Sequence, residues 1–264
     1  MSSEAKQRKN VKLKMWGIGL AVVAASLAQV APANAVVKTK LLMFGDSLTQ
    51  EANHSITTPF KSNASYTIAV HPQTGAAPCD FLPGITKALN GSSHYRLLAI
   101  ETAGNSQSKC MRVPGSCSRC YLPIGSPEWE ARYRADLNAI VDLADSKGTQ
   151  VLFLSPPPMA DIGIARNDVD TTVEPTLAVD HPEVVFTDGP RQSVSDAGGN
   201  YTPTLPCLAS ETAADGCTAG VIPIRAPDGT HFCPTGFVTV CPEYSSGAYR
   251  FGTATASAIE ALLP

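Results

Sequence analysis

The sequence predicts a three-layer α/β/α sandwich with a central parallel sheet of about five strands. Five short runs of apolar and β-branched residues are nearly continuous rather than alternating, which is typical of parallel strands that are covered on both faces. Segments with helical periodicity lie between several of these runs, as they do in α/β folds. The predicted strands span residues 40–44, 66–70, 96–101, 150–155 and 183–187.

The helix predicted over residues 127–147 has the clearest signals. Ser126 is placed to cap its N-terminus, Pro127 occupies the first helical position, and Gly148 follows its last turn. Two more helices are predicted over residues 80–89 and 248–263. The apolar residues of the helix over residues 127–147 recur at helical spacing and indicate one buried face: Trp129, Tyr133, Leu137, Ile140, Val141 and Leu143.

Two long stretches, residues 160–178 and 188–224, are rich in Asp, Thr, Pro and Gly and predict excursions over the surface. Loops of this length in a compact domain are usually functional or disordered. The second stretch contains Cys207 and Cys217, which favours an ordered loop. We expect it to form one wall of the functional site.

The first 35 residues have the order of a secretory signal peptide. A basic stretch, residues 6–14, precedes an apolar run, residues 15–30, and Ala33-Asn34-Ala35 offers small residues at a cleavage site. The apolar run of about 16 residues is shorter than the roughly 20 that span a bilayer, so we expect cleavage after Ala35 rather than a retained anchor. Residues 36–264 then form a single domain of a secreted or cell-envelope protein, without stable membrane insertion.

The composition narrows the class of partner. Five of the 20 Lys and Arg residues and one of the 23 Asp and Glu residues lie in the first 35 positions, so the remainder carries 15 basic and 22 acidic residues, a net charge of −7. This acidity excludes nucleic acid as a partner, because a phosphate backbone requires a basic surface. About 229 residues remain, which suits one domain with a sizeable core, and we expect a monomer.

All eight cysteines follow the expected cleavage point, and an even number in an oxidising compartment predicts four disulfides. A zinc site built from Cys110, Cys117, Cys120 and a histidine is the alternative, but the chain is predicted to be secreted and has no second cysteine pair of that spacing. We therefore expect no metal. Chain proximity and the predicted fold favour the pairs Cys79 with Cys110, Cys117 with Cys120, Cys207 with Cys217, and Cys233 with Cys241.

Segments that follow the first three predicted strands converge on one edge of the sheet, where open parallel sheets bind ligands. Ser47 lies at a strand-to-helix turn in a Gly-Asp-Ser-Leu sequence, Gly75 follows the second strand, and Asn105 follows the third. The backbone N–H groups of Ser47 and Gly75 and the side-chain amide of Asn105 are candidate donors of an oxyanion hole. A plain turn role for Gly75 and a helix-cap role for Asn105 are the alternatives.

A serine hydroxyl needs a base to accept its proton before it can attack a carbonyl. Asp228 and His231, with Gly229 between them, can share one tight turn, in which the carboxylate accepts the imidazole Nδ1 proton and leaves Nε2 for Ser47. Ser47 is thus the candidate nucleophile, His231 the base and Asp228 its orienting acid. Asp188 is the rival acid, although its Asp-Gly-Pro sequence is more typical of a turn that ends a strand.

Together these motifs resemble the SGNH or GDSL hydrolase superfamily, which carries Gly-Asp-Ser-Leu after an apolar strand, a glycine and an asparagine after later strands, and a terminal Asp-x-x-His. From about Lys38 to its end, the sequence is similar to secreted actinobacterial members and to the SGNH domain fused to some membrane acyltransferases. Ser106 stands where family members often carry an aspartate. The strongest likeness lies in residues 74–82, 103–105, 132–136 and 225–234.

The resemblance implies a flavodoxin-like fold and a secreted serine esterase that cleaves carboxylic esters through an acyl-serine intermediate without a cofactor. It also implies Ser47 as the nucleophile, Gly75 and Asn105 as oxyanion donors, and Asp228 and His231 as partners of Ser47. The substrate class stays open among O-acetylated cell-wall or other polysaccharide and lipid esters. An O-acyltransferase with the same triad and a non-catalytic binding module of the same fold are the alternative functions.

Overall fold

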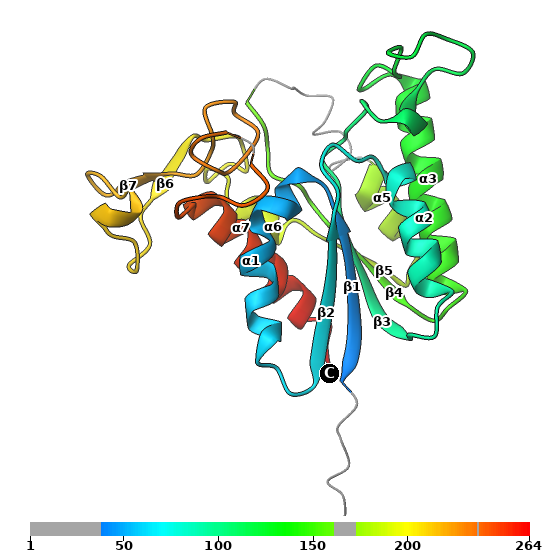
Figure 1. Ribbon diagram of the computed structural model, residues 1–264, viewed down its shortest axis with the longest axis horizontal. Helices are drawn as coiled ribbons and strands as arrows, with labels where there is room; N and C mark the ends of the chain where they lie inside the picture. The colour runs from blue at the N-terminus through cyan, green and yellow to red at the C-terminus, as the bar shows by residue number, and fades with distance from the viewer. Residues whose placement is uncertain (1–37, 161–172, 237) are drawn as a thin grey trace, which may run out of the picture. The chain divides into compact units, whose positions relative to one another are not determined.

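The computed structural model describes residues 38–160, 173–236 and 238–264, all within one compact unit that spans Val36–Pro264. The expected signal peptide, residues 1–35, lies outside the described residues. Within this unit, a central sheet lies between two layers of helices (Figure 1). This is the three-layer α/β/α arrangement that the sequence predicts.

The described residues form a sheet of five parallel strands in the order β2-β1-β3-β4-β5. Each strand begins and ends within two residues of its predicted bounds. The strands are β1 (Thr39–Gly45), β2 (Tyr66–Pro72), β3 (Tyr95–Glu101), β4 (Gln150–Leu154) and β5 (Val184–Thr187).

The burial of β1 explains why its sequence is continuously apolar. Leu41 and Met43 pack into the core on one face of the sheet, whereas Leu42 and Phe44 pack into the core on the other. Successive side chains of a strand point to opposite faces, so a strand between two helical layers needs apolar residues at every position. The same reasoning holds for the buried middle of β3.

Helices cover both faces of the sheet (Figure 1). The helix α3 matches its prediction closely, since Ser126 Oγ accepts the Trp129 N–H at 3.2 Å and Gly148 follows its last turn with a φ of +64°. On one face lie α1 (Ser47–Lys61), α6 (Gly189–Gln192) and α7 (Ser246–Glu260), and on the other lie α2 (Pro78–Leu89), α3 (Pro127–Asp145) and α5 (Glu174–Asp180).

The sequence predicts a helix start at Ser47 but does not delimit α1. This helix carries many threonines and an internal Pro59, which obscure its pattern. Its signal is a stripe of apolar residues four positions apart, all of which are buried against the sheet and α7: Leu48, Ala52, Ile56 and Phe60.

The two predicted excursions contain more regular structure than expected. Residues 161–172 of the first lie outside the described residues, and α5 begins soon after them. The second contains a short antiparallel hairpin, β6 (Thr204–Pro206) and β7 (Val221–Pro223). Short 3₁₀ turns, η1 (Lys109–Met111) and η3 (Ala213–Asp215), complete the described elements. None of the described helices has both the length and the apolarity to cross a bilayer.

Candidate active site

The strand order reverses between β1 and β3, because the chain leaves β1 for β2 on one side and then crosses to β3 on the other. Ligand sites in open parallel sheets lie at such a switch point, beyond the carboxyl ends of the strands. A depression of about 380 Å³ lies there, lined by residues from separate parts of the chain. The lining includes all five residues of the preferred triad and oxyanion hole, which are Ser47, Gly75, Asn105, Asp228 and His231.

Ser47 lies at the junction of β1 and α1. Gly45 is the last residue of β1, and only glycine fits there because a Cβ atom would lie 2.0 Å from the Thr49 hydroxyl oxygen. Asp46 caps α1 by accepting the Leu48 N–H at 2.9 Å, which leaves Ser47 as the first helical residue. The Ser47 hydroxyl is therefore presented at a helix N-terminus, where unpaired backbone N–H groups and the helix dipole favour negative charge.

Asp46 is fully buried and organises the loops around the start of α1. Its second carboxylate oxygen accepts the Ala103 N–H at 3.1 Å and the Asn105 side-chain amide at 2.7 Å. Glu101, at the end of β3, accepts the Thr49 hydroxyl at 2.7 Å and the Asp46 N–H at 3.3 Å. Buried carboxylates require such hydrogen bonds in place of water. The network thus fixes the start of α1 against the loop that follows β3.

Asp228 and His231 share one tight turn. Gly229 has a φ of +69°, which L-residues rarely adopt, and a Cβ atom there would lie 2.5 Å from the Ala160 Cβ. One Asp228 oxygen accepts the backbone N–H groups of Thr230 and His231, each at 2.9 Å. The other oxygen lies 2.7 Å from His231 Nδ1. The turn therefore holds the carboxylate against the imidazole.

The imidazole of His231 connects this turn to Ser47. Its Nε2 lies 3.1 Å from Ser47 Oγ, although 184 positions separate the two residues. Burial alone would raise the pKa of Asp228, but hydrogen bonds from the backbone and ring of His231 and from the Thr230 N–H outweigh burial and lower this pKa. Asp228 is therefore ionised beside the imidazole at neutral pH.

The three candidate oxyanion donors are not equivalent. Ser47 and Gly75 line the depression, and their backbone N–H groups donate to no atom of the described residues. Gly75 has a φ of +66°, a conformation that favours glycine. The Asn105 side-chain nitrogen instead donates to Asp46 at 2.7 Å and to the Ala76 carbonyl at 3.1 Å. Both amide hydrogens of Asn105 are thus used, and donation to an oxyanion requires release of one of these bonds.

The stretch 188–224 does not wall the depression, and that expectation was wrong. Within the described residues, the lining contains Met159 but nothing from this stretch. Glu211 explains why, because Arg250 of α7 donates to its carboxylate at 2.9 Å and draws the hairpin region toward α7. The rival acid Asp188 accepts a hydrogen bond from the side-chain amide of Gln192 at 3.1 Å.

Arg225 is a buried residue that the sequence analysis did not single out as functional. Its guanidinium donates to the carbonyls of Thr230 at 3.3 Å and Pro158 at 2.9 Å. The same group lies 4.8 Å from the centre of the Phe232 ring. Burial lowers the pKa of Arg225 to about 9. Arg225 thus fixes the backbone immediately before His231.

Glu51 is the second buried residue that the sequence analysis missed. It lies on α1, one turn after Ser47, and its Oε2 accepts the Phe232 N–H at 2.6 Å. The available signal was a charged residue between the apolar positions Leu48 and Ala52 of a helix that starts at Ser47, because a carboxylate at such a place needs a partner.

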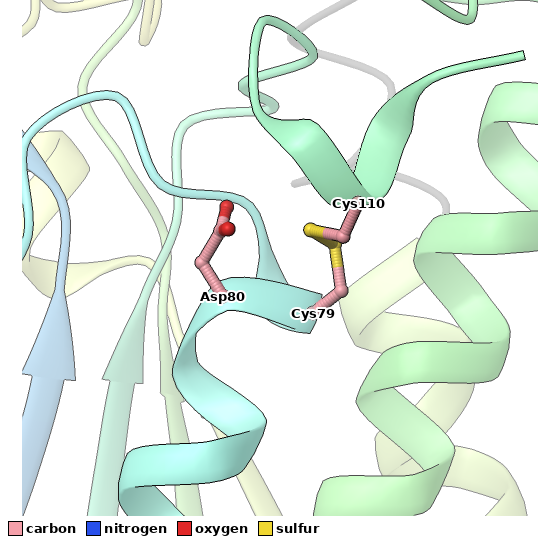
Figure 2. Close-up of side chains that lie close together, drawn as sticks. All are labelled: Cys79, Asp80 and Cys110. Carbon is pink, nitrogen blue, oxygen red and sulfur yellow. A yellow bond between two sulfur atoms is a disulfide. The ribbon is translucent and has the colours of Figure 1, made fainter.

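Disulfides join the four cysteine pairs that chain proximity favoured. Cys79, Asp80 and Cys110 lie close together at the start of α2, with ligand atoms within 4.8 Å of one another (Figure 2). The two sulfur atoms are bonded to each other, and Asp80 accepts a hydrogen bond from the N–H of Ala77, the N-cap residue of α2, at 2.9 Å. The disulfide and this hydrogen bond explain why the three side chains lie together: both stabilise the start of α2. The three cysteines of the zinc alternative are likewise disulfide-bonded.

The architecture is that of the SGNH hydrolases. Similar solved structures include a GDSL-like lipase from Bacteroides thetaiotaomicron, with 16% identity, a TM-score of 0.51 and coverage of 85% of this chain and 89% of that chain. TesA has 14% identity, a TM-score of 0.53 and coverage of 85% and 100%. A catalytic mutant of Axe2, an acetylxylan esterase from Geobacillus stearothermophilus, has 13% identity, a TM-score of 0.52 and coverage of 86% and 97%. At these identities the likeness establishes the fold.

The sequence itself identifies a narrower group. Residues 40–243 match the family described as "Protein of unknown function (DUF459)", and the chain belongs to this family. No curated protein sequence matches the chain.

Proposed function

We propose that this protein is a secreted serine esterase that hydrolyses a carboxylic ester through an acyl-serine intermediate. The proposal rests above all on one observation: His231 lies 3.1 Å from Ser47 Oγ on one side and 2.7 Å from Asp228 Oδ2 on the other. A hydroxyl, an imidazole and a carboxylate in this order are the parts of an acyl-transfer triad. Their place at the switch point of the sheet supports the assignment.

In the proposed reaction, Ser47 Oγ forms a bond to the ester carbonyl carbon while its proton passes to His231 Nε2. Asp228 stays ionised, accepts a hydrogen bond from the Nδ1–H group of His231 and stabilises the imidazolium. The tetrahedral intermediate then breaks its bond to the leaving alcohol, which takes the proton from Nε2. Water repeats the sequence on the acyl-serine, releases the acid and restores the Ser47 hydroxyl.

The negative oxygen of the tetrahedral intermediate needs donors aimed at it. We assign this role to the backbone N–H groups of Ser47 and Gly75, which the structure leaves available. Asn105 becomes the third donor when the oxyanion replaces the Ala76 carbonyl, which accepts the longer of its two bonds. This exchange keeps the bond from Asn105 to Asp46 and therefore keeps the loop in place.

The four disulfides are typical of a protein that folds outside the cytoplasm. We propose secretion by cleavage after Ala35, which would make Val36 the first residue of the mature protein. N-terminal sequencing of the protein recovered from the culture medium tests this. An N-terminus upstream of the apolar run would contradict cleavage and favour an anchored form.

The esterase proposal is tested with purified, oxidised protein and p-nitrophenyl esters of increasing acyl length, together with acetylated xylan and peptidoglycan. A fluorophosphonate probe, located by peptide mass spectrometry, should label Ser47. Absence of both hydrolysis and labelling in folded protein would favour a binding module. Transfer of the acyl group to an added sugar in excess of free acid would favour an acyltransferase.

A further inference from the structure

Glu51 links the helix of the nucleophile to the segment of the base. It lies four residues after Ser47 on α1, and its side chain is buried, with 6% of the residue exposed. The Phe232 N–H donates to its Oε2 at 2.6 Å, and Phe232 directly follows His231. A hydrogen bond of this length from a backbone N–H to a buried carboxyl oxygen is strong and directional. The helix that presents Ser47 therefore also holds the backbone of His231.

Arg225 holds the same backbone from the other side. It donates to the Thr230 carbonyl at 3.3 Å, and Thr230 directly precedes His231. His231 thus lies between two peptide groups that are each bound by a buried charged side chain. These two contacts restrict the backbone from which the imidazole reaches Ser47 Oγ.

The charge on Glu51 is not needed for this backbone contact, because a neutral amide oxygen also accepts an N–H. Burial raises the pKa of Glu51 above its ordinary value, against the opposing effects of the Phe232 N–H and of the nearby His231. An ionised Glu51 is therefore unfavourable for the fold. The titratable and charged groups around it are His231, Arg225, His54 on its own helix, and Glu243, Tyr244 and Tyr249 across a neighbouring groove.

We propose that Glu51 is a second acidic positioning residue for His231. Its hydrogen bond to the Phe232 N–H fixes the base opposite Ser47, and its negative charge stabilises the imidazolium that forms when His231 takes the Ser47 proton. This inference rests on the proposed role of His231 as the base. Glu51 does not line the depression that contains Ser47, so it acts through His231 rather than on the substrate.

The test compares Glu51→Gln with Glu243→Gln in the purified, oxidised protein. Glutamine keeps an acceptor for the Phe232 N–H and removes only the charge. Glu243 is an exposed carboxylate on the same groove, so its variant controls for a general change of charge. For Glu51→Gln we expect kcat to fall roughly three- to tenfold with KM unchanged, and the acidic limb of the kcat/KM profile to move roughly half to one pH unit lower.

Thermal unfolding separates this role from a structural one. Because burial disfavours the ionised carboxylate, Glu51→Gln should unfold at the same or a higher temperature than the parent while it loses activity. Glu243→Gln should resemble the parent in activity, pH profile and unfolding. Parent-like kinetics in Glu51→Gln would overturn the proposal. So would a loss of activity that tracks a lower unfolding temperature and leaves the pH profile unmoved.

A readout without substrate distinguishes this proposal from the esterase proposal. The ring-proton resonance of His231, assigned by its absence in His231→Gln, is followed by NMR through a pH titration. Its midpoint should move to lower pH in Glu51→Gln and stay in place in Glu243→Gln. If the midpoint moves but the protein has no esterase activity, the effect of Glu51 on His231 is supported and the enzyme function is refuted. An unmoved midpoint in an active esterase would refute the role of the Glu51 charge.

Discussion

Ser47 lies at the start of α1, just beyond the carboxyl end of β1, whereas His231 lies on a turn near the end of the chain. The Ser47 half is held by Asp46 and Glu101, which are fully buried and bind the loops that follow β1 and β3. The His231 half is more open, since the side chain of its partner Asp228 is 42% exposed. It is attached to the rest of the molecule by long-range contacts from Arg225 and Glu51.

The difference separates two ways of building one site. The position of Ser47 is a consequence of the sheet, because the buried carboxylates that hold it also join the segments that follow β1 and β3. The position of His231 depends on a few bonds from side chains to backbone, which can be lost while the core stays intact. Variants of the residues that hold Ser47 should therefore cost mainly stability, and variants of the residues that hold His231 should cost mainly activity.

The largest effect is expected where the two halves meet. Ser47→Ala and His231→Ala should each lower esterase kcat/KM by at least about a thousandfold, since each removes a group that changes bonds in the reaction. Both variants should unfold within a few degrees of the parent. Asp228→Asn should lose less, because the imidazole keeps its place and loses mainly the control of its tautomer. Substantial activity in either alanine variant would refute the assigned roles.

Asp46→Ala should have the largest effect on stability. It removes the cap of α1 and leaves the buried Ala103 N–H and the Asn105 amide without their acceptor, at a cost of about 2–4 kcal/mol in the free energy of unfolding. Ser126→Ala is the matched control, because it removes only the cap of α3 and should cost about 1 kcal/mol. Denaturant unfolding measures both. Equal losses would mean that Asp46 acts only as a cap.

The two halves also differ in how well the sequence predicts them. The five strands were predicted closely, because burial on both faces demands continuous apolar runs that are visible in one segment at a time. The pair Asp228 and His231 was visible for the same reason, since its geometry depends on a spacing of three residues. Local patterns therefore predicted the sheet and the two turns that carry Ser47 and His231.

Contacts between distant segments were not predictable in this way. Glu51 and Phe232 are 181 residues apart, and no sequence motif indicates that they are in contact. Arg225 reads as an ordinary charged residue until the fold buries it beside two carbonyls. The prediction that residues 188–224 wall the site was wrong for a similar reason. The ion pair of Glu211 with Arg250 joins that stretch to α7, and no local pattern indicates this contact. Polar contacts between distant segments therefore position the residues around the site, and a pattern within one segment cannot predict such contacts.

Arg225→Met should lower activity more than stability, in contrast to Asp46→Ala, whose main effect is on stability. Methionine retains much of the bulk, and replacement of a buried charge by an apolar residue is often tolerated. The Thr230 and Pro158 carbonyls lose their donor, so the turn that carries His231 loosens and kcat should fall by about tenfold, with less than about 1.5 kcal/mol lost in unfolding. Arg134→Met, at a surface ion pair, should change neither quantity appreciably. A stability loss like that of Asp46→Ala would abolish the distinction between the halves.

The smallest expected effect distinguishes the two carboxylates that flank His231. The pKa of Asp228 is lowered in the fold, so its contribution to stability is present above the ordinary carboxyl pKa of about 4 and is lost as pH falls through the folded value. The pKa of Glu51 is raised, so its contribution is present below the unfolded value and is lost as pH rises through the folded value. At neutral pH, Asp228→Asn should therefore lower the unfolding temperature by roughly a degree or two, and Glu51→Gln should raise it or leave it unchanged.

Both differences from the parent should fade in acid, where the two carboxylates are protonated in the folded and unfolded states alike. Calorimetric scans of the three proteins from about pH 2 to pH 8 measure this. A shift of the same sign in both variants at neutral pH would show that the two groups do not act oppositely on the fold. Opposite signs, combined with a loss of activity in both, would mean that the active geometry keeps one carboxylate that the fold favours and one that it does not, and that the second is retained for its effect on the imidazole.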